Sequence, residues 1–140
     1  MRLPVLVALL SLASPAIAAD VVVHVDGVKD KGGTVLVALY AHDPVFQDPA
    51  KVVEAKAVAG QVDVALKDVP AGDYVVTAWH DADDDRKLGM AGGRLSEGTA
   101  ISNAERLRGA PSFAVNKVPI PAAGGAITLA MSYPEDRTGW

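Results

Sequence analysis

The chain has 140 residues, half of them hydrophobic, with a formal net charge of −4 and no cysteine. A chain of this size can bury one hydrophobic core but is too short for two ordinary domains. The lack of cysteine excludes disulfides, thiolate metal sites and a lipid anchor on cysteine. The acidic balance argues against nucleic acid or an anionic membrane surface as a partner, because both would repel the protein.

The N-terminal segment has the features of a secretory signal peptide. Arg2 supplies a short charged region, residues 3–12 form an apolar run, and Ala16-Ile17-Ala18 has the small-x-small pattern of a cleavage site. The apolar run is well short of the ~20 residues that a spanning helix needs. We therefore expect cleavage after Ala18 or Ala19 and a periplasmic or secreted product without a membrane span. The predicted organisation is a signal peptide over residues 1–19, one domain over 20–134 and a polar, frayed tail over 135–140.

Beyond this segment, hydrophobic and polar residues alternate in short runs rich in valine, separated by glycine, proline and aspartate. Alternation with a period of two is typical of β-strands. The pattern predicts about seven strands, at residues 21–26, 34–40, 52–58, 61–67, 74–80, 111–118 and 126–133. Because the turns are short and no amphipathic helix of ordinary length occurs, we predict an all-β fold, a single immunoglobulin-like or transthyretin-like β-sandwich.

Three local features refine this prediction. Residues 34–40 are apolar on both faces, as in a strand at the middle of a sheet that is covered by a second layer. Pro70 and Gly72 favour a tight turn, so Val62–Val69 and Tyr74–His80 are expected to pair as a hairpin. Phe46 lies in a loop and is expected to plug the end of the core.

The segment from Asp81 to Ala110 has no strand pattern, and a connection of this length within a compact domain is usually functional or disordered. Ser102 and Glu105 have the spacing of a capping box, in which the two side chains satisfy N–H groups at a helix start. With Gly109 as a stop signal, we expect one to two turns of helix at about Asn103–Arg108. The predicted sandwich therefore has one long loop that carries a short helix.

The stretch from Asp81 to Gly89, which we call the Asp-rich loop, begins with alternating Asp81, Asp83 and Asp85. Ca²⁺ takes six to eight oxygen ligands, and this spacing matches the first, third and fifth positions of an EF-hand loop. The carbonyl of Lys87 falls at the next ligand position of that pattern. Glu97 is the later carboxylate that could complete the shell if it folds back.

Two positions depart from the EF-hand pattern. Arg86 stands where an EF-hand has glycine, and Gly92 stands where it has a bidentate glutamate. A solvated turn is therefore an alternative, with Arg86 and Lys87 neutralising the aspartates without a metal. Like charges this close repel by up to roughly 1 kcal/mol per pair in water, and a bound dication would relieve that repulsion.

Catalytic motifs are absent from the sequence: it has no nucleophile elbow, no cysteine nucleophile and no phosphate-binding glycine loop. Of the three histidines, His24 is expected to be structural or to lie at the surface. A zinc or iron site of His42, His80 and a carboxylate would suit the ligand preferences of those metals, although nothing local brings the two histidines together. We expect His80 instead to donate a ring N–H that supports the loop, with Ser102 and Asn103 also in supporting positions.

The leading hypothesis is a non-enzymatic exported binding module. Its Asp-rich loop would bind Ca²⁺ and present a surface to a partner protein or glycan at the cell envelope. The alternative is a metal-dependent enzyme of unknown reaction that uses His80, Asp81 and Glu97.

The run from Val69 to Asp81, followed by the Asp-rich loop, Glu97 and Ser102-Asn103, resembles the DUF2141 family of exported bacterial proteins. Members share a core of proline, glycine and tyrosine before a strand that ends in His-Asp and an Asn-rich loop. The resemblance covers most of the mature chain. It implies a secreted or periplasmic β-sandwich and no established activity.

The Asp-rich loop departs from the family pattern at several positions. Asp83 and Asp85 stand where asparagine is common, which changes the charge but keeps an oxygen ligand. Arg86 replaces a usual glycine, and Gly89 replaces a usual aspartate, which removes one potential ligand. Two later departures, where proline and glycine are usual, are Leu95 and Ala100.

Overall fold

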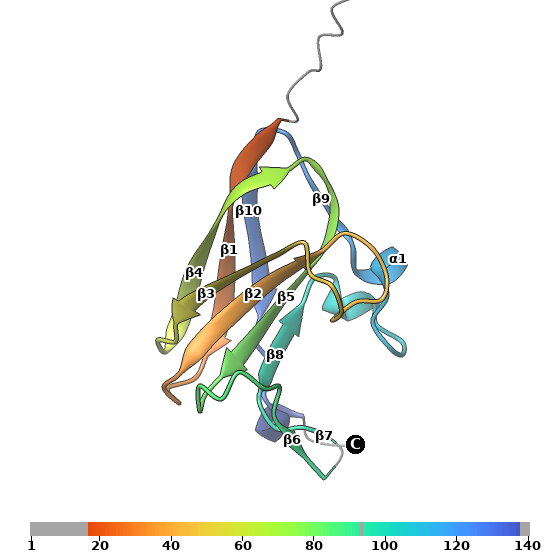
Figure 1. The fold of residues 1–140 in the computed structure, drawn as a ribbon. Helices are drawn as coiled ribbons and strands as arrows, with labels where there is room; N and C mark the ends of the chain where they lie inside the picture. The colour runs from red at the N-terminus through yellow and green to blue at the C-terminus, as the bar shows by residue number, and fades with distance from the viewer. Residues whose placement is uncertain (1–16, 93, 138–140) are drawn as a thin grey trace, which may run out of the picture.

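The computed structural model describes residues 17–92 and 94–137, apart from the side chains of residues 91, 94 and 95. Within them, a three-stranded sheet of order β10-β1-β4 packs on a five-stranded sheet of order β3-β2-β5-β8, in which β9 also pairs with β5 (Figure 1). The strands are β1 Ala18–Val28, β2 Thr34–Tyr40, β3 Lys51–Lys56, β4 Gly60–Pro70, β5 Gly72–Asp81, β6 Met90–Ala91, β7 Arg94–Leu95, β8 Gly98–Ile101, β9 Val118–Ile120 and β10 Gly125–Ala130. The predicted all-β sandwich is confirmed.

The predicted signal peptide lies outside the described residues as far as residue 16. Both predicted cleavage sites fall at the start of β1, where Ala18 and Ala19 pair with Pro70 and Val69 of β4. In the described part of the chain, no helix is long and apolar enough to cross a membrane.

β1 shows how the valine alternation builds the core. It is the central strand of its sheet, parallel to β10 and antiparallel to β4. Val21, Val23 and Val25 point inward and are at most 1% exposed, whereas His24 on the other face bonds to Asp63 at 2.6 Å. Each buried valine stabilises the fold by about 1.5–3 kcal/mol relative to an exposed one. The inward-facing residues of the alternating pattern therefore form the core.

β2 occupies the predicted central position, because it pairs with β3 and β5. Its inward residues Val35, Val37 and Leu39 are at most 1% exposed. The opposite face, with Leu36 and Ala38, is only half-buried. The prediction of a central strand in a sheet that packs on a second layer is therefore confirmed, and the outer face of this sheet is left partly open.

The predicted hairpin of residues 62–69 and 74–80 is wrong. β4 pairs with β1, whereas β5 pairs with β2, β8 and β9 in the other sheet. The chain changes sheets at Ala71, and the Tyr74 hydroxyl donates to the Pro70 carbonyl at 2.8 Å across this corner. β4 alternates buried and exposed residues, while β5 is buried on both faces along most of its length. The two patterns belong to different positions in a sandwich, which the turn composition alone does not reveal.

The strand predicted for residues 111–118 is mostly wrong. Phe113–Asn116 form the short helix α1, and β9 begins only at the end of the predicted range. The Ser112 hydroxyl caps α1 by accepting the Val115 N–H at 3.3 Å. The buried Asn116 carboxamide accepts the Ser112 N–H at 3.2 Å. Such local bonds from side chain to backbone compete with strand formation.

The predicted helix is reduced to the 3₁₀ turn η1 (Ala104–Arg106), and the capping box is wrong. Ser102 is buried, and its hydroxyl donates to the Asn116 carbonyl at 2.6 Å and accepts the Val76 N–H at 3.0 Å. Asn103 caps the turn in a left-handed conformation without a side-chain cap bond. The Ser102 hydroxyl is thus used to join two distant segments.

The expectation for Phe46 and the expectation for the segment after Asp81 are also corrected. Phe46 does not plug the core, since it is 56% exposed with its ring 6.0 Å from that of Tyr40. The segment predicted to lack strands contains β8, in which Thr99 pairs with Trp79. β8 has only four residues, too few for its alternation to be visible in the sequence.

Tyr133 connects the two sheets through a buried polar network. Its hydroxyl bonds to His80 Nδ1 at 2.7 Å and accepts the Lys29 N–H at 2.9 Å. His80 Nε2 lies 2.6 Å from the Gly32 carbonyl, which can only accept, so Nε2 carries the proton and Tyr133 donates to Nδ1. Burial raises the pKa of Tyr133. Stability is therefore lost as the pH rises above 10.0, because the unfolded chain releases this proton first.

The last described residues are held in place, so the expectation of a frayed tail is wrong for this part. The 3₁₀ turn η2 spans Pro134–Asp136. Lys31 Nζ donates to Glu135 at 2.6 Å, and Lys29 Nζ donates to Glu135 at 3.0 Å and to Asp136 at 2.8 Å. The bond from Lys31 has the largest effect on Glu135, and with the bond from Lys29 it lowers the pKa of Glu135 to about 2.

Replacing Tyr133 with phenylalanine should lower the free energy of unfolding by about 1–3 kcal/mol, because buried groups of His80 and Lys29 lose their partner. Urea denaturation followed by circular dichroism measures this loss. Tyr74→Phe is the matched control, since its hydroxyl has one partner, the Pro70 carbonyl, at a partly buried position. The control should lose less, and equal losses would contradict the role of the Tyr133 network.

Candidate metal centre

The pairing of β5 with β8 brings two carboxylates together from distant parts of the chain. The strands run antiparallel with His80 opposite Gly98. Asp81 and Glu97 each lie one residue beyond this pair, so they face each other at the end of the sheet. Asp81 is fully buried, and Glu97 is half-buried.

The Glu97 side chain is fixed by two donors to the same oxygen. Trp79 Nε1 donates to Glu97 Oε2 at 2.6 Å, and the Gly89 N–H donates to it at 2.8 Å. Gly89 also accepts the Ser96 N–H at 2.9 Å. A Cβ at Gly89 would lie 2.5 Å from Ser96 Oγ and 3.1 Å from Glu97 Cδ. The glycine therefore permits the close approach that places Glu97 against the Asp-rich loop.

The Asp-rich loop is folded by its own aspartates. Asp81 accepts the N–H groups of Asp85 at 3.3 Å and Arg86 at 3.0 Å. Asp83 also accepts the Asp85 N–H at 3.3 Å, and Asp85 accepts the Lys87 N–H at 2.8 Å. Aspartate favours such turns because its short side chain reaches the backbone two residues on. The loop curls around the carboxylates as a result.

Arg86 and Asp84 point away from the carboxylates at the centre of this loop. Arg86 has φ 62° and Asp84 has φ 54°, so both adopt the left-handed backbone conformation. This conformation costs a residue other than glycine roughly 1–2 kcal/mol. The guanidinium pairs with Glu54 of β3. Asp84 accepts a hydrogen bond from Thr34 Oγ1 at 2.6 Å. Arg86 therefore does not neutralise the loop in the way the solvated-turn alternative requires.

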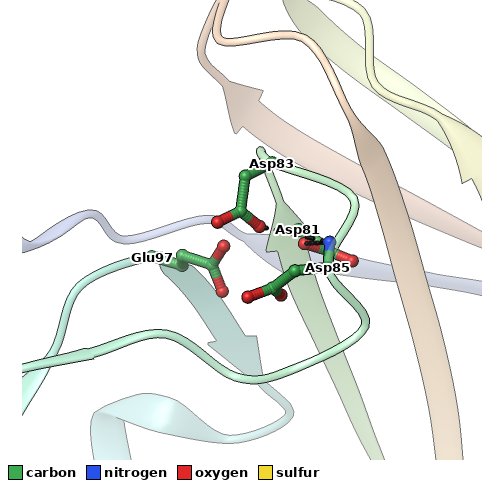
Figure 2. A group of neighbouring side chains, drawn as sticks. All are labelled: Asp81, Asp83, Asp85 and Glu97. Carbon is green, nitrogen blue, oxygen red and sulfur yellow. Dashed lines mark hydrogen bonds between the residues drawn. The ribbon is translucent and has the colours of Figure 1, made fainter.

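Four carboxylates converge on one point (Figure 2). Asp81, Asp83, Asp85 and Glu97 each offer an oxygen, and these four atoms lie within 4.8 Å of one another. Among the described side chains, no lysine or arginine forms an ion pair with any of them. Repulsion at this spacing is roughly 1 kcal/mol per pair even in water. We call these four residues the carboxylate cluster.

The chemistry of the carboxylate cluster is that of a hard-cation site. Four carboxylates can supply four to eight oxygen atoms, and calcium takes six to eight. The cluster contains no histidine, in contrast to the imidazole and thiolate ligands that dominate zinc sites. It is the one such group of three or more side chains among the described residues.

Lys87 and the residues expected to support the loop are placed differently. Lys87 contacts the cluster through its backbone N–H, which donates a hydrogen bond to Asp85. His80 points to the opposite face of β5, where both ring nitrogens are bonded. Ser102 and Asn103 lie beyond the far end of β8, and the Asn103 carboxamide donates to the Lys117 carbonyl at 2.9 Å.

The two histidines of the hypothetical zinc or iron site do not meet in one metal-ligating group within the described residues. His42 lies in an exposed loop, and its Nδ1 bonds to the carbonyl of Asp43 at 2.8 Å. His80 is fully buried. A zinc or iron site that unites them is therefore wrong.

A groove of about 990 Å³ on the outer face of the five-stranded sheet was not foreseen. Its floor includes Leu36, Ala38 and Tyr40 of β2, together with Trp79 of β5. The apolar outer face of residues 34–40 is the sequence feature that indicates it. From that pattern we predicted a central strand in a sheet that packs on a second layer, not a groove. Trp79 joins the groove to the carboxylate cluster through its bond to Glu97.

Comparison with known proteins identifies the family. Residues 23–128 match the sequence profile of a family described as uncharacterized protein conserved in bacteria, DUF2141. No curated protein and no solved structure matches the chain significantly. The matched range includes strands of both sheets and all four residues of the carboxylate cluster. Because the match covers well over half of the 140 residues, the chain belongs to the DUF2141 family.

Proposed function

We propose that this protein is a non-enzymatic, exported binding module whose Asp-rich loop takes up Ca²⁺. The convergence of four carboxylates within 4.8 Å carries the proposal. They come from two segments that the pairing of β5 with β8 brings together, and the backbone N–H groups of the loop hold all four side chains in position. The loop is therefore organised around its carboxylates before any cation arrives.

Calcium fits this arrangement better than the other common divalent cations. The donors are all oxygen atoms, which disfavours zinc. Ca²⁺ also tolerates irregular shells of six to eight ligands, whereas Mg²⁺ demands a near-ideal octahedron. Asp83 and Asp85 are exposed, so water can complete the shell. We expect a Kd of about 10⁻⁴ to 10⁻³ M, the range of extracellular modules.

The bonding of His80 favours binding over catalysis. The alternative enzyme would use His80 with Asp81 and Glu97. Both nitrogens of His80 are bonded within the protein, to Tyr133 and to the Gly32 carbonyl. Asp81 and Glu97 therefore have no imidazole beside them to exchange a proton during a reaction.

Exposed apolar side chains beside the loop support a surface for a partner protein or glycan at the cell envelope. Leu88 is 42% exposed and Met90 is 59% exposed. Exposed apolar groups that lie together mark interaction surfaces more often than isolated ones do. The signal-peptide pattern of the N-terminal segment supports a periplasmic or secreted location, where such a surface would meet its partner.

Calcium should raise the melting temperature of the protein by a few degrees. With a Kd of about 1 mM, 10 mM CaCl₂ stabilises the folded state by about 1.4 kcal/mol relative to EDTA. The double variant Asp83→Asn/Asp85→Asn should lose this shift. Asp84→Asn is the control, because it removes one negative charge from the same loop at a carboxylate that faces Thr34 and lies outside the cluster. Differential scanning calorimetry measures all three proteins.

Two results of this experiment would contradict a calcium site in the carboxylate cluster. The first is an equal calcium shift in all three proteins, which would place any binding elsewhere. The second is a shift with ZnCl₂ and none with CaCl₂, which would favour the metal-dependent enzyme.

Replacing Arg86 with glycine should tighten calcium binding by about two- to fourfold, because it removes a positive charge near the site. Glycine also accepts the left-handed backbone at this position. Arg86→Lys keeps the charge and serves as the control, with an expected unchanged affinity. Isothermal titration calorimetry gives both constants. Weaker binding in the glycine variant would indicate that the pair with Glu54 shapes the loop.

A further inference from the structure

The register of the five-stranded sheet orders the floor of the groove into rows. The first row is Leu36, Trp79, Thr99 and Ser132, and the second is Val52, Ala38, Thr77 and Ile101. Tyr40 extends the floor beyond the second row. The distance from Leu36 to Tyr40 along β2 is four residues, about 13 Å. The floor is thus a long, mostly apolar strip.

The carboxylate cluster lies next to the first row of this strip. Asp81 lies opposite Thr34 in the register of β5 and β2, two residues beyond Trp79 on the same face. Glu97 lies two residues before Thr99 on β8 and accepts a hydrogen bond from Trp79. An occupant of the groove would therefore reach the cation site with its near end.

The floor and walls of the groove expose apolar side chains to solvent. Phe46 is 56% exposed, Val52 is 48% exposed and Leu88 is 42% exposed. Three large apolar side chains around one concave surface favour an apolar occupant. The volume of about 990 Å³ lies at the upper end of the range for small-molecule sites.

Arg137 is the one cationic side chain in the lining of the groove, within the part of the chain that the structure describes. It donates to Thr99 Oγ1 at 3.1 Å, to Ser132 Oγ at 3.2 Å and to the Ser132 carbonyl at 3.2 Å. No described carboxylate forms an ion pair with it. These bonds anchor the guanidinium at the first row, near the carboxylate cluster. Its charge suits a carboxylate ligand, which arginine binds with two parallel hydrogen bonds.

We infer that the groove binds a free aliphatic monocarboxylate in a calcium-dependent manner. The aliphatic tail lies along the floor toward Tyr40 and Phe46, and the carboxylate head lies at the end formed by Arg137 and the cluster. This inference rests on the calcium site proposed above. Without a cation, the four carboxylates repel an anionic head. With Ca²⁺ bound, the same end attracts it.

Charge favours this ligand over a membrane surface. The protein carries a net charge of −4, so an anionic bilayer with its many charges repels it. A small monocarboxylate carries one charge, and salt screens most of its long-range repulsion from the protein. The loops around the floor also leave a groove rather than a flat apolar face.

Three probes with the same tail and different heads test the inference: octanoate, octanol and octyltrimethylammonium. Each is titrated into the protein with 5 mM CaCl₂ or with EDTA, and NMR follows the backbone amides of Ala38, Thr77 and Ile101. In calcium, octanoate should bind about tenfold more tightly than octyltrimethylammonium. In EDTA this order should reverse, because the free carboxylate cluster then attracts the cationic head.

Two variants test the charged end and the floor of the groove. Arg137→Gln should weaken octanoate binding by about tenfold, the effect of one lost charged bond, and leave octanol binding unchanged. Ala38→Leu fills the middle of the floor and should weaken all three probes. Lys67→Gln, a charge removal on β4 in the other sheet, is the control and should change nothing. Melting temperatures confirm that each variant folds.

The outcomes separate failure of the groove from failure of the calcium site. If calcium raises the melting temperature but octanoate shifts no amide of the floor, the ligand inference is wrong and the calcium site stands. If octanoate binds equally in calcium and EDTA, the groove is a ligand site without calcium control and the inference is overturned. Binding only to anionic vesicles, and not to free octanoate, would identify a membrane surface instead.

Discussion

The antiparallel pairing of β5 with β8 is the constraint on which both candidate sites depend. It places His80 opposite Gly98, and the lack of a side chain at Gly98 leaves room for the ring of Tyr133, because a Cβ there would lie 2.5 Å from that ring. Tyr133 then bonds to His80 and closes the sandwich. The same pairing sets Asp81 beside Glu97. A single register therefore fixes the inner polar network and the outer carboxylates.

The alternation of β5 divides these roles between its two faces. Ala78 and His80 point into the core, where His80 is fully buried and satisfied by neutral partners. Thr77, Trp79 and Asp81 point outward, toward the groove and the carboxylate cluster. Because residues on a strand alternate strictly, His80 and Asp81 are neighbours in sequence but belong to different environments. The outer face can thus bind a charged ligand without exposing the core to it.

How far the sequence predicts this structure depends on whether a feature is local. The alternation of the valines in β1 predicts their burial, and the spacing of Asp81, Asp83 and Asp85 predicts a loop around their carboxylates. Pairing between distant strands cannot be predicted from local patterns of this kind. The turn at Pro70 is visible in the composition, but the change of sheet at Ala71 depends on which strands are already paired.

Side-chain partners from distant segments were equally hidden. Ser102 has the local spacing of a helix cap, yet its hydroxyl bonds to Val76 and to Asn116. These bonds satisfy buried backbone groups that a cap would leave unpaired. The position of Glu97 depended on the strand β8, which is too short for its alternation to be visible in the sequence. All four members of the carboxylate cluster were therefore named from the sequence, but whether Glu97 folds back onto the loop depended on the sheet.

The most direct test of the account uses Tb³⁺, a calcium analogue, and the contact between Trp79 and Glu97. In a Trp140→Phe protein, excitation of Trp79 should transfer energy to Tb³⁺ bound in the carboxylate cluster. The account predicts sensitised emission that saturates at one Tb³⁺ per chain and is reversed by excess Ca²⁺. Emission that fails to appear, or that calcium does not displace, would contradict a calcium site at the end of β5.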